Sequence, residues 1–313
     1  MGARGIMGAV VAGWVVVGCG VAEPDMASAP SLETAVQKSV HSNDRGLNGP
    51  TLNGSFQGRT LASVSYDGAR REGMSAGFDE VWLEGSALHG LMGGDEFSGL
   101  DFRQVRFTGT LDDGSPVTLR VDGITQGSDA DQDVWTYQVT YLEPSTGLWN
   151  PICLAADGTA QGAIAMESKW DYRQGVLGGG SKVYDTTSFT FACDGGALAK
   201  CVRFGYAPWR TLNGVSLEEH HQACTRMVRA DFCGDGTSYT VSGNLINLYD
   251  SLGVQKDTEA WVPEAEWTTA GASCFSSQTR ATTPIQCGER LVSSCASSFA
   301  PETMLISETP PQN

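Results

Sequence analysis

Hydrophobic and polar residues alternate along much of the chain between residues 51 and 192. Alternate positions are apolar in 105–111, in 117–121 after an Asp-Asp-Gly-Ser turn, and in 135–141. This alternation is typical of strands that bury one face. Further strand candidates lie at 61–66, 80–83, 164–166 and 188–192. Short antiparallel strands at this spacing predict a β-sandwich or a partly open barrel.

The pattern changes after residue 192, where a helical period appears. One face of a helix predicted over 217–231 carries Leu217, His221, Cys224 and Val228. Ser216 and Glu219 have the spacing of a capping box at its start. A second short helix is predicted at 264–270. The predicted fold class is β-rich α+β, in which a sandwich or barrel is followed by a disulfide-rich segment with one or two short helices.

Composition along the chain suggests where its parts begin and end. The segment before residue 51 is rich in small and polar residues, which is typical of a linker. We expect a short amphipathic helix at 32–40 within it, and His41 in solvent. The predicted parts are a leader at 1–18, a flexible tether at 19–50, a β-rich domain at 51–192, a cysteine-rich segment packed on it at 193–300, and a disordered tail at 301–313.

The net charge of the chain bears on which partners it can bind. The 313 residues include 20 Lys and Arg against 36 Asp and Glu, a net charge of −16. A nucleic-acid-binding surface needs clustered cations to neutralise phosphates, so this balance argues against one. A hydrophobic content of 41% is sufficient for a substantial core.

The N-terminal residues have the plan of an export signal. Arg4 precedes an apolar run at 6–17 that ends in Gly18 and Cys19. The run is too short for a stable membrane span. Val16-Val17-Gly18-Cys19 resembles a bacterial lipobox, in which the cysteine thiol receives a diacylglyceryl group and becomes the new N-terminus. The alternatives are an ordinary signal peptide cut nearby, or a cytosolic start with an apolar first strand.

Cysteine usage agrees with export. Setting aside Cys19, the nine cysteines of the chain leave an even set of eight. In an oxidising compartment these would form up to four disulfides. Structural zinc is the alternative, but the close C-x2-C pairs of most zinc sites are absent. We favour a local Cys287–Cys295 bridge and leave the other pairings open; the disulfide candidates are Cys153, Cys193, Cys201, Cys224, Cys233, Cys274, Cys287 and Cys295.

A longer pattern surrounds these cysteines. Residues 230–236 read Ala-Asp-Phe-Cys-Gly-Asp-Gly, and Trp149-Asn150-Pro151-Ile152-Cys153, Trp170-Asp171 and Ala272-Ser273-Cys274 lie on either side. With its cysteines in register over about 149–274, the chain resembles the ADYC domain family of bacterial exported lipoproteins. Phe232 stands where the family name has tyrosine. The resemblance implies an exported location and assigns no catalytic residue, because the family has no known activity.

Two adjacent histidines are the strongest candidates for catalysis. Histidine side chains ordinarily titrate near neutral pH, and Cys224 follows His221 at a spacing of three residues, about one helical turn. A Cys/His nucleophile pair would need a free thiolate at Cys224, whereas an even cysteine set favours a disulfide there. We therefore expect a core histidine beside a disulfide. Asp231 is the acid that such a site could use.

Other sequence features suggest ligands less directly. Asp129, Asp131 and Asp133 could converge on calcium, but they lack the glycine and glutamate of an EF-hand loop, so we expect a solvated acidic hairpin tip. The Gly-rich segment 175–182 has no phosphate-loop order and is expected to be a flexible loop. Most tryptophans are expected to be buried, with a carbohydrate or peptide platform as the alternative. No cofactor or metal is predicted.

These observations favour a lipid-anchored cell-envelope protein that binds or supports other components without catalysis. The alternative is an exported hydrolase or transferase that uses His220 or His221. The predicted partners are the membrane, through the lipid, and an envelope protein or glycan, with no nucleic acid. The predicted location is a bacterial membrane surface, the outer membrane being favoured, facing the periplasm or the exterior.

Overall fold

The computed structural model describes Gly2, residues 40–296 and residues 300–311. The described residues from 40 onward belong to one compact unit. Cys19, the predicted leader and nearly all of the predicted 32–40 helix lie outside the described residues. Within the described residues, no helix has the length and apolar character needed to cross a membrane.

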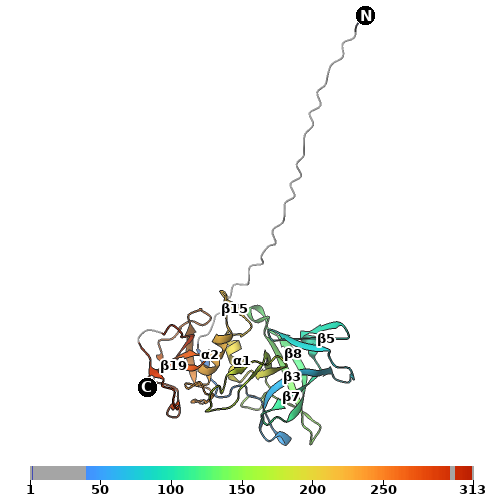
Figure 1. The fold of residues 1–313 in the computed structure, drawn as a ribbon, viewed down its shortest axis with the longest axis horizontal. Helices are drawn as coiled ribbons and strands as arrows, with labels where there is room; N and C mark the ends of the chain where they lie inside the picture. Colours follow the sequence, from blue (N-terminus) through green and yellow to red (C-terminus); the bar gives the residue numbers. More distant parts are fainter. Residues whose placement is uncertain (1, 3–39, 297–299, 312–313) are drawn as a thin grey trace. The chain divides into compact units, whose positions relative to one another are not determined.

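The first half of the unit is a closed barrel (Figure 1). Its strands pair in the order β9-β11-β14-β3-β7-β8, and β8 returns to pair with β9. The β-rich prediction is confirmed, and the predicted partly open barrel is closed by this last pairing. The barrel strands are β3 (Arg59–Arg71), β7 (Val105–Leu111), β8 (Pro116–Gln126), β9 (Trp135–Leu142), β11 (Ala163–Glu167) and β14 (Ser188–Cys193).

Alternation along these strands fills the barrel interior. Phe107 on β7 lies opposite Leu119 on β8, and Leu119 lies opposite Tyr141 on β9. These three side chains are buried in one core cluster together with Phe189 and Phe191 of β14. The polar residues between them face outward, as the period of two requires.

Shorter elements lie beside the barrel strands and in the loops that follow them. A three-stranded sheet packs against it where the buried Tyr137 hydroxyl donates to Ser86 O at 2.9 Å and accepts from Leu88 N at 3.0 Å. The short elements are β2 (Thr51–Leu52), η2 (Gly54–Phe56), β4 (Glu80–Glu84), β5 (Ala87–Met92), β6 (Asp95–Ser98), η3 (Gly99–Phe102), η4 (Asp129–Asp131), β10 (Trp149–Pro151), β12 (Lys169–Trp170), β13 (Lys182–Val183), β15 (Thr211–Leu212) and β16 (Val215–Ser216).

The second half contains a six-stranded sheet in the order β1-β17-β21-β18-β19-β20. The predicted helix at 264–270 is wrong, because these residues lie in β18 and the turn that follows it. The predicted disordered tail is also wrong over 305–309, which form β21 between β17 and β18. The strands are β1 (Val40–Ser42), β17 (Leu245–Asp250), β18 (Val262–Thr268), β19 (Gly271–Phe275), β20 (Ser293–Ser294) and β21 (Leu305–Thr309).

The C-terminal part of the predicted tether is also ordered. Val40–Ser42 pairs with β17, and Leu47 and Asn48 are buried. His41 is half-buried and stacks on Phe204 with ring centroids 3.9 Å apart, so the prediction that His41 lies in solvent is wrong. Because these residues complete a sheet edge, the linker-like composition of 40–50 does not produce a linker.

Two helices lie between the barrel and the second sheet (Figure 1). Helix α1 (Ala197–Arg203) contacts β14 of the barrel, and α2 (Glu218–Val228) packs on β18 and β19. The predicted helix at 217–231 is confirmed in type and is shorter at both ends. The predicted capping box is wrong, since Ser216 belongs to β16 and accepts a hydrogen bond from Glu218 N at 3.2 Å instead.

Four disulfides join these parts. The predicted Cys287–Cys295 bridge is wrong, because each of these cysteines pairs with one on a different segment. The pairing of β19 with β20 holds Cys295 beside Cys274. Cys287 bonds to Cys233, which follows the end of α2. The bridges are Cys153–Cys193, Cys201–Cys224, Cys233–Cys287 and Cys274–Cys295.

Candidate functional site

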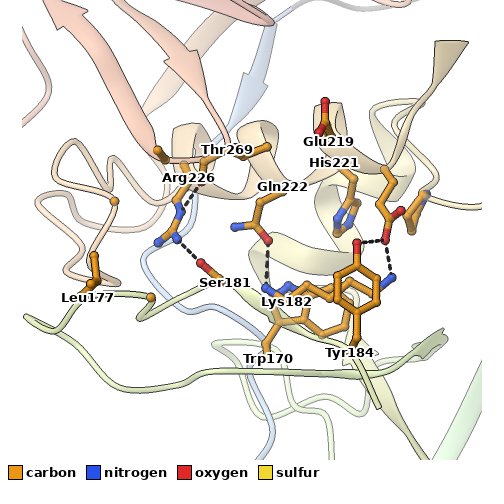
Figure 2. A pocket seen from close by; sticks show the side chains of 15 residues that line it. Trp170, Leu177, Ser181, Lys182, Tyr184, Glu219, His221, Gln222, Arg226 and Thr269 are labelled. Atoms are coloured by element: carbon orange, nitrogen blue, oxygen red, sulfur yellow. Dashed lines mark hydrogen bonds and ion pairs between the residues drawn. The ribbon is translucent and has the colours of Figure 1, made fainter. Parts of the chain in front are cut away.

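Helix α2 presents His221 to a pocket of about 400 Å³ (Figure 2). The pocket lies between the first turns of α2, the segment 177–184 and the turn at 269–270. Leu177 and Tyr184 stand at its rim and are 98% and 75% exposed. A cavity of this size lies in the lower part of the range for small-molecule sites, about 300–1,000 Å³.

His221 has a fixed tautomer in this pocket. Its side chain is buried, and its Nε2 atom lies 3.0 Å from Leu198 O. A carbonyl oxygen only accepts hydrogen bonds, so Nε2 must carry the proton. Burial lowers the pKa of His221 to about 4, and the ring is neutral at pH 7. Its other nitrogen, Nδ1, therefore has a free lone pair.

Charged side chains line the same pocket in balanced numbers. Lys182 Nζ donates to Glu218 Oε1 at 2.7 Å, and the Tyr184 hydroxyl donates to the same oxygen at 3.0 Å. Burial raises the pKa of Glu218, but the hydrogen bonds from Lys182 and Tyr184 outweigh it and the net pKa is lowered. Glu218 is therefore ionised at neutral pH. Glu219 adds a second, exposed carboxylate.

Arg226 closes one end of the pocket and is almost completely buried. Its guanidinium group pairs with Asp231 and donates to Gly179 O at 2.5 Å, Ser181 Oγ at 2.6 Å and Thr269 O at 3.2 Å. The glycines of the 175–182 segment make this approach possible. A Cβ at Gly180, where φ is +73°, would lie 2.6 Å from Arg226 Nη1.

Asp231 does not reach the pocket. Its carboxylate is fully buried and accepts hydrogen bonds from Gly236 N at 3.0 Å and Asp235 N at 3.2 Å, besides the pairing with Arg226. These donors use both of its oxygens. Asp231 therefore holds the turn after α2, which is a structural role, and it lies outside the set of residues that line the pocket.

His220 points elsewhere. It is buried beside Tyr206, with ring centroids 6.3 Å apart, and does not line the pocket with His221. Burial lowers its pKa, and its Nδ1 atom has no hydrogen-bond partner among the described residues. The acid near it, Asp250, already accepts from the Tyr206 hydroxyl at 2.6 Å.

The Cys224 sulfur cannot act as a nucleophile, because it is bonded to Cys201. The Cys/His hypothesis is therefore excluded, and the expected disulfide at this position is confirmed.

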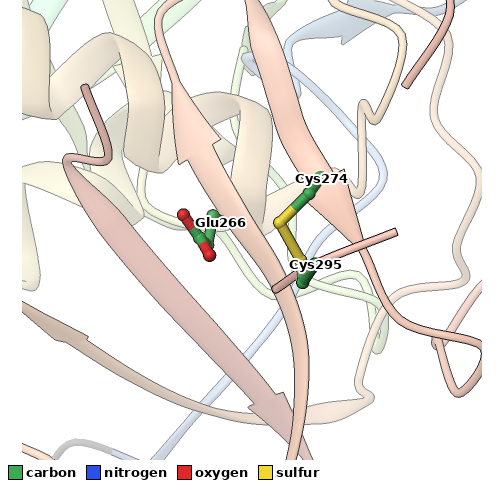
Figure 3. A group of neighbouring side chains, drawn as sticks. All are labelled: Glu266, Cys274 and Cys295. Carbon is green, nitrogen blue, oxygen red and sulfur yellow. A yellow bond between two sulfur atoms is a disulfide. The ribbon is translucent and has the colours of Figure 1, made fainter. Parts of the chain in front are cut away.

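A second cluster has the composition of a metal site: Glu266, Cys274 and Cys295 lie close together (Figure 3). Both of its sulfurs are joined in a disulfide, so they offer no thiolate to a metal.

The three aspartates of the β8–β9 connection are not arranged alike. Asp133 accepts from Trp209 Nε1 at 2.7 Å and from Arg210 Nε at 2.8 Å, and Arg210 also donates to Asp131 at 3.1 Å. Asp129 is exposed. Two of the three carboxylates therefore face a guanidinium group. This arrangement ties the hairpin tip to the loop after α1.

The sequence patterns indicate His221 and the glycine-rich segment, but not the side chains that complete the pocket. Trp170, Lys182, Tyr184 and Arg226 line the pocket with His221. The glycines at 175–180 are the sequence signal closest to these residues, and they predict only a flexible loop. In the structure these glycines allow close packing against Arg226.

The fold and site define a disulfide-linked β protein in which a buried Arg226–Asp231 centre holds a glycine-rich segment against a helix. The model of the ADYC domain family matches residues 99–281, more than half of the chain. The chain belongs to this family. No curated protein and no solved structure matches it. The motif that names the family, here residues 230–233, contains the buried aspartate of this centre.

Proposed function

We propose that the chain is an exported, lipid-anchored protein of the bacterial cell envelope whose folded unit binds another component and catalyses no reaction. The observation that carries this proposal is the pairing of all eight cysteines beyond Cys19 in disulfides. Disulfides persist in oxidising compartments and are rare in the cytosol. The lipobox-like sequence before Cys19 agrees with that location.

The chemistry of the candidate residues favours binding over catalysis. A general base is most effective when its pKa is near the working pH. Burial takes the pKa of His221 to about 4, so His221 is a poor base at neutral pH. Both oxygens of Asp231 already accept hydrogen bonds, and Cys224 is in a disulfide. What remains at the pocket is a set of positioned hydrogen-bonding groups.

Acylation of Cys19 is the decisive test of the anchor. The full chain would be expressed in a bacterium that processes lipoproteins, and its mature N-terminus analysed by mass spectrometry. We expect cleavage before Cys19 and the mass of acyl chains on it, and no acylation in Cys19→Ala. An unmodified N-terminus at another residue would overturn the proposal. A lipid anchor would hold the protein at the membrane because each buried methylene contributes about 0.8 kcal/mol.

A further inference from the structure

The pocket beside α2 contains two buried side chains with an unused polar atom. His221 and Trp170 are 2% and 4% exposed. His221 Nδ1 makes no hydrogen bond with any described residue, and Trp170 Nε1 is buried without a partner. Their rings lie 6.1 Å apart between centroids, and both line the pocket. Buried polar atoms are normally paired, so the unpaired indole N–H of Trp170 indicates a missing partner, and His221 Nδ1 is a second unused polar atom at the same cavity.

The two atoms have opposite hydrogen-bonding roles, one an acceptor and the other a donor. His221 Nδ1 can only accept a hydrogen bond in the tautomer fixed by Leu198, and an indole N–H can only donate one. A hydroxyl group does both. Trp170 Nε1 is closed off from solvent, so a ligand would reach it only after a small movement of the pocket lining. His221 Nδ1 is the primary contact for this reason.

The charged side chains that line the pocket do not favour a charged ligand. The ionised side chains that line the pocket are Lys182 and Arg226 against Glu218 and Glu219, two of each sign. Lys182 is paired with Glu218, and Arg226 with Asp231. A phosphate would find both cations of the lining already paired. An ammonium group would gain only the exposed carboxylate of Glu219, where solvent screens the attraction. An uncharged ligand fits this balance.

The rim supplies apolar contact. Leu177 and Tyr184 are large side chains that stand exposed at the mouth (Figure 2). The carboxylate of Glu218 accepts hydrogen bonds from Lys182 and Tyr184, and Glu219 adds an exposed carboxylate to the lining. Such a mixture suits a ring with an apolar face and a hydroxylated edge. We propose that the pocket binds one or two sugar units of an uncharged glycan, with a sugar hydroxyl donating to His221 Nδ1. This rests on the proposed non-enzymatic envelope function.

Binding would be tested on the full acylated chain in a detergent without a sugar headgroup. The probes are glucose, N-acetylglucosamine, maltose and chitobiose, observed by saturation-transfer NMR and isothermal titration calorimetry. Glucose 6-phosphate and glucosamine serve as charged comparators. We expect millimolar or tighter binding of at least one neutral sugar. Absence of binding by all four neutral sugars, or tighter binding of a charged comparator, would overturn the proposal.

Variants locate the site. His221→Gln reaches the position of Nε2 through the same number of bonds, so it can keep the hydrogen bond to Leu198 O while removing the Nδ1 acceptor. We expect it to weaken binding by about fivefold to tenfold, the value of one hydrogen bond. Leu177→Ala should also weaken binding, and Leu291→Ala should not, because Leu291 is 96% exposed but lies outside the pocket. Equal effects of the two leucine variants would contradict the assignment.

His221→Gln is informative only if it is folded, which its thermal unfolding at pH 7 would establish; if it is not, the leucine pair decides. The same samples distinguish the sugar-binding proposal from the proposal of a lipid-anchored protein without catalysis. Missing acyl mass with intact sugar binding would refute the lipid anchor alone. Cleavage of maltose or chitobiose during the NMR experiment would refute the non-enzymatic function while leaving the sugar site in place.

Discussion

Arg226 and Asp231 form an ion pair whose side chains are 2% and 0% exposed, five residues apart at the end of α2. The pair joins segments that are distant in sequence. Arg226 reaches Gly179 and Ser181 before the helix and Thr269 after it. Asp231 holds the backbone of the turn at 235–236. The aspartate of the family motif is thus part of the framework of the pocket.

Removing Arg226 should destabilise the fold strongly. A buried charge left without its partner costs about 3–5 kcal/mol. We expect Arg226→Ala to lower the free energy of unfolding by about that amount in urea titrations monitored by tryptophan fluorescence. Arg226→Lys should recover only part of it, since an ammonium group cannot reach all four partners of the guanidinium.

Arg173 is the matched control. It also pairs with an aspartate, Asp171, at 2.6 Å, but its side chain is 71% exposed. Exposed pairs contribute about 0–1 kcal/mol, so Arg173→Ala should have little effect. A similar loss of stability in both alanine variants would show that burial does not set the value of these pairs.

The disulfide pairing can be read directly by peptide mapping without reduction. We expect the cross-linked peptides to contain Cys274 with Cys295 and Cys233 with Cys287. A peptide containing a Cys287–Cys295 bridge would contradict the structure. Thiol titration of the unreduced, acylated protein should detect no free thiol, because all eight cysteines beyond Cys19 are paired.

One bridge should also matter measurably for stability. Cys201–Cys224 closes a loop with a sequence separation of 23 residues between α1 and α2. By the loop-entropy model such a bridge contributes about 3 kcal/mol. The double variant Cys201→Ala with Cys224→Ala should therefore have a lower unfolding midpoint. An unchanged midpoint would mean that packing alone holds the two helices together.

Acidification should weaken the fold through His221. Burial lowers the pKa of His221 in the folded state to about 4, from 6.5. Between these values the unfolded chain binds more protons, so stability falls as the pH falls from about 6.5 to 4 and is unaffected above that range. The shift corresponds to about 3 kcal/mol at the acid end.

His221→Gln isolates this contribution. The unfolding free energies of the wild-type chain and the variant would be compared from pH 4 to pH 7 in urea. Lys182 and Glu218, whose charges act on His221, are the same in both proteins, and so is His220. The difference between the two proteins should therefore shrink as the pH falls. A constant difference would mean that His221 does not titrate in this window.

Much of the barrel could be predicted from sequence because its signal is local. Alternation in 105–111, 117–121 and 135–141 identified strands that became β7, β8 and β9. The second sheet gave weaker signals. Glu264 lies in a strand and is fully buried because Arg280, sixteen residues later, pairs with it. Such a partner is invisible to a local pattern, which suggested a helix instead.

The C-terminal strand was missed for a related reason. Ser307 and Glu308 look like tail residues, yet both are buried in β21. Ser307 accepts from Trp267 Nε1 at 2.9 Å, and Glu308 accepts from Asn247 at 2.9 Å. A local pattern does not reveal the pocket because its lining comes from separate segments between Trp170 and Ala270. Disulfide pairing was beyond reach because eight cysteines allow roughly a hundred combinations.

Calcium should not stabilise the β8–β9 connection. Burial raises the pKa of Asp133, but hydrogen bonds from Arg210 and Trp209 outweigh it and the net pKa is lowered. The ionised carboxylate is thus already compensated by a cation, and Asp131 shares the same guanidinium. A calcium ion would have to displace Arg210 to gain the oxygens it requires.

The measurement is a thermal melt after chelation, with and without millimolar calcium. A ligand that binds only the folded state raises the unfolding temperature by mass action, so an unchanged melt is the expected result. Arg210→Ala should lower stability and free both carboxylates, which makes it the variant best placed to gain a calcium response. A clear calcium-dependent rise in the unmodified protein would mean that the aspartates can leave Arg210 and coordinate the ion.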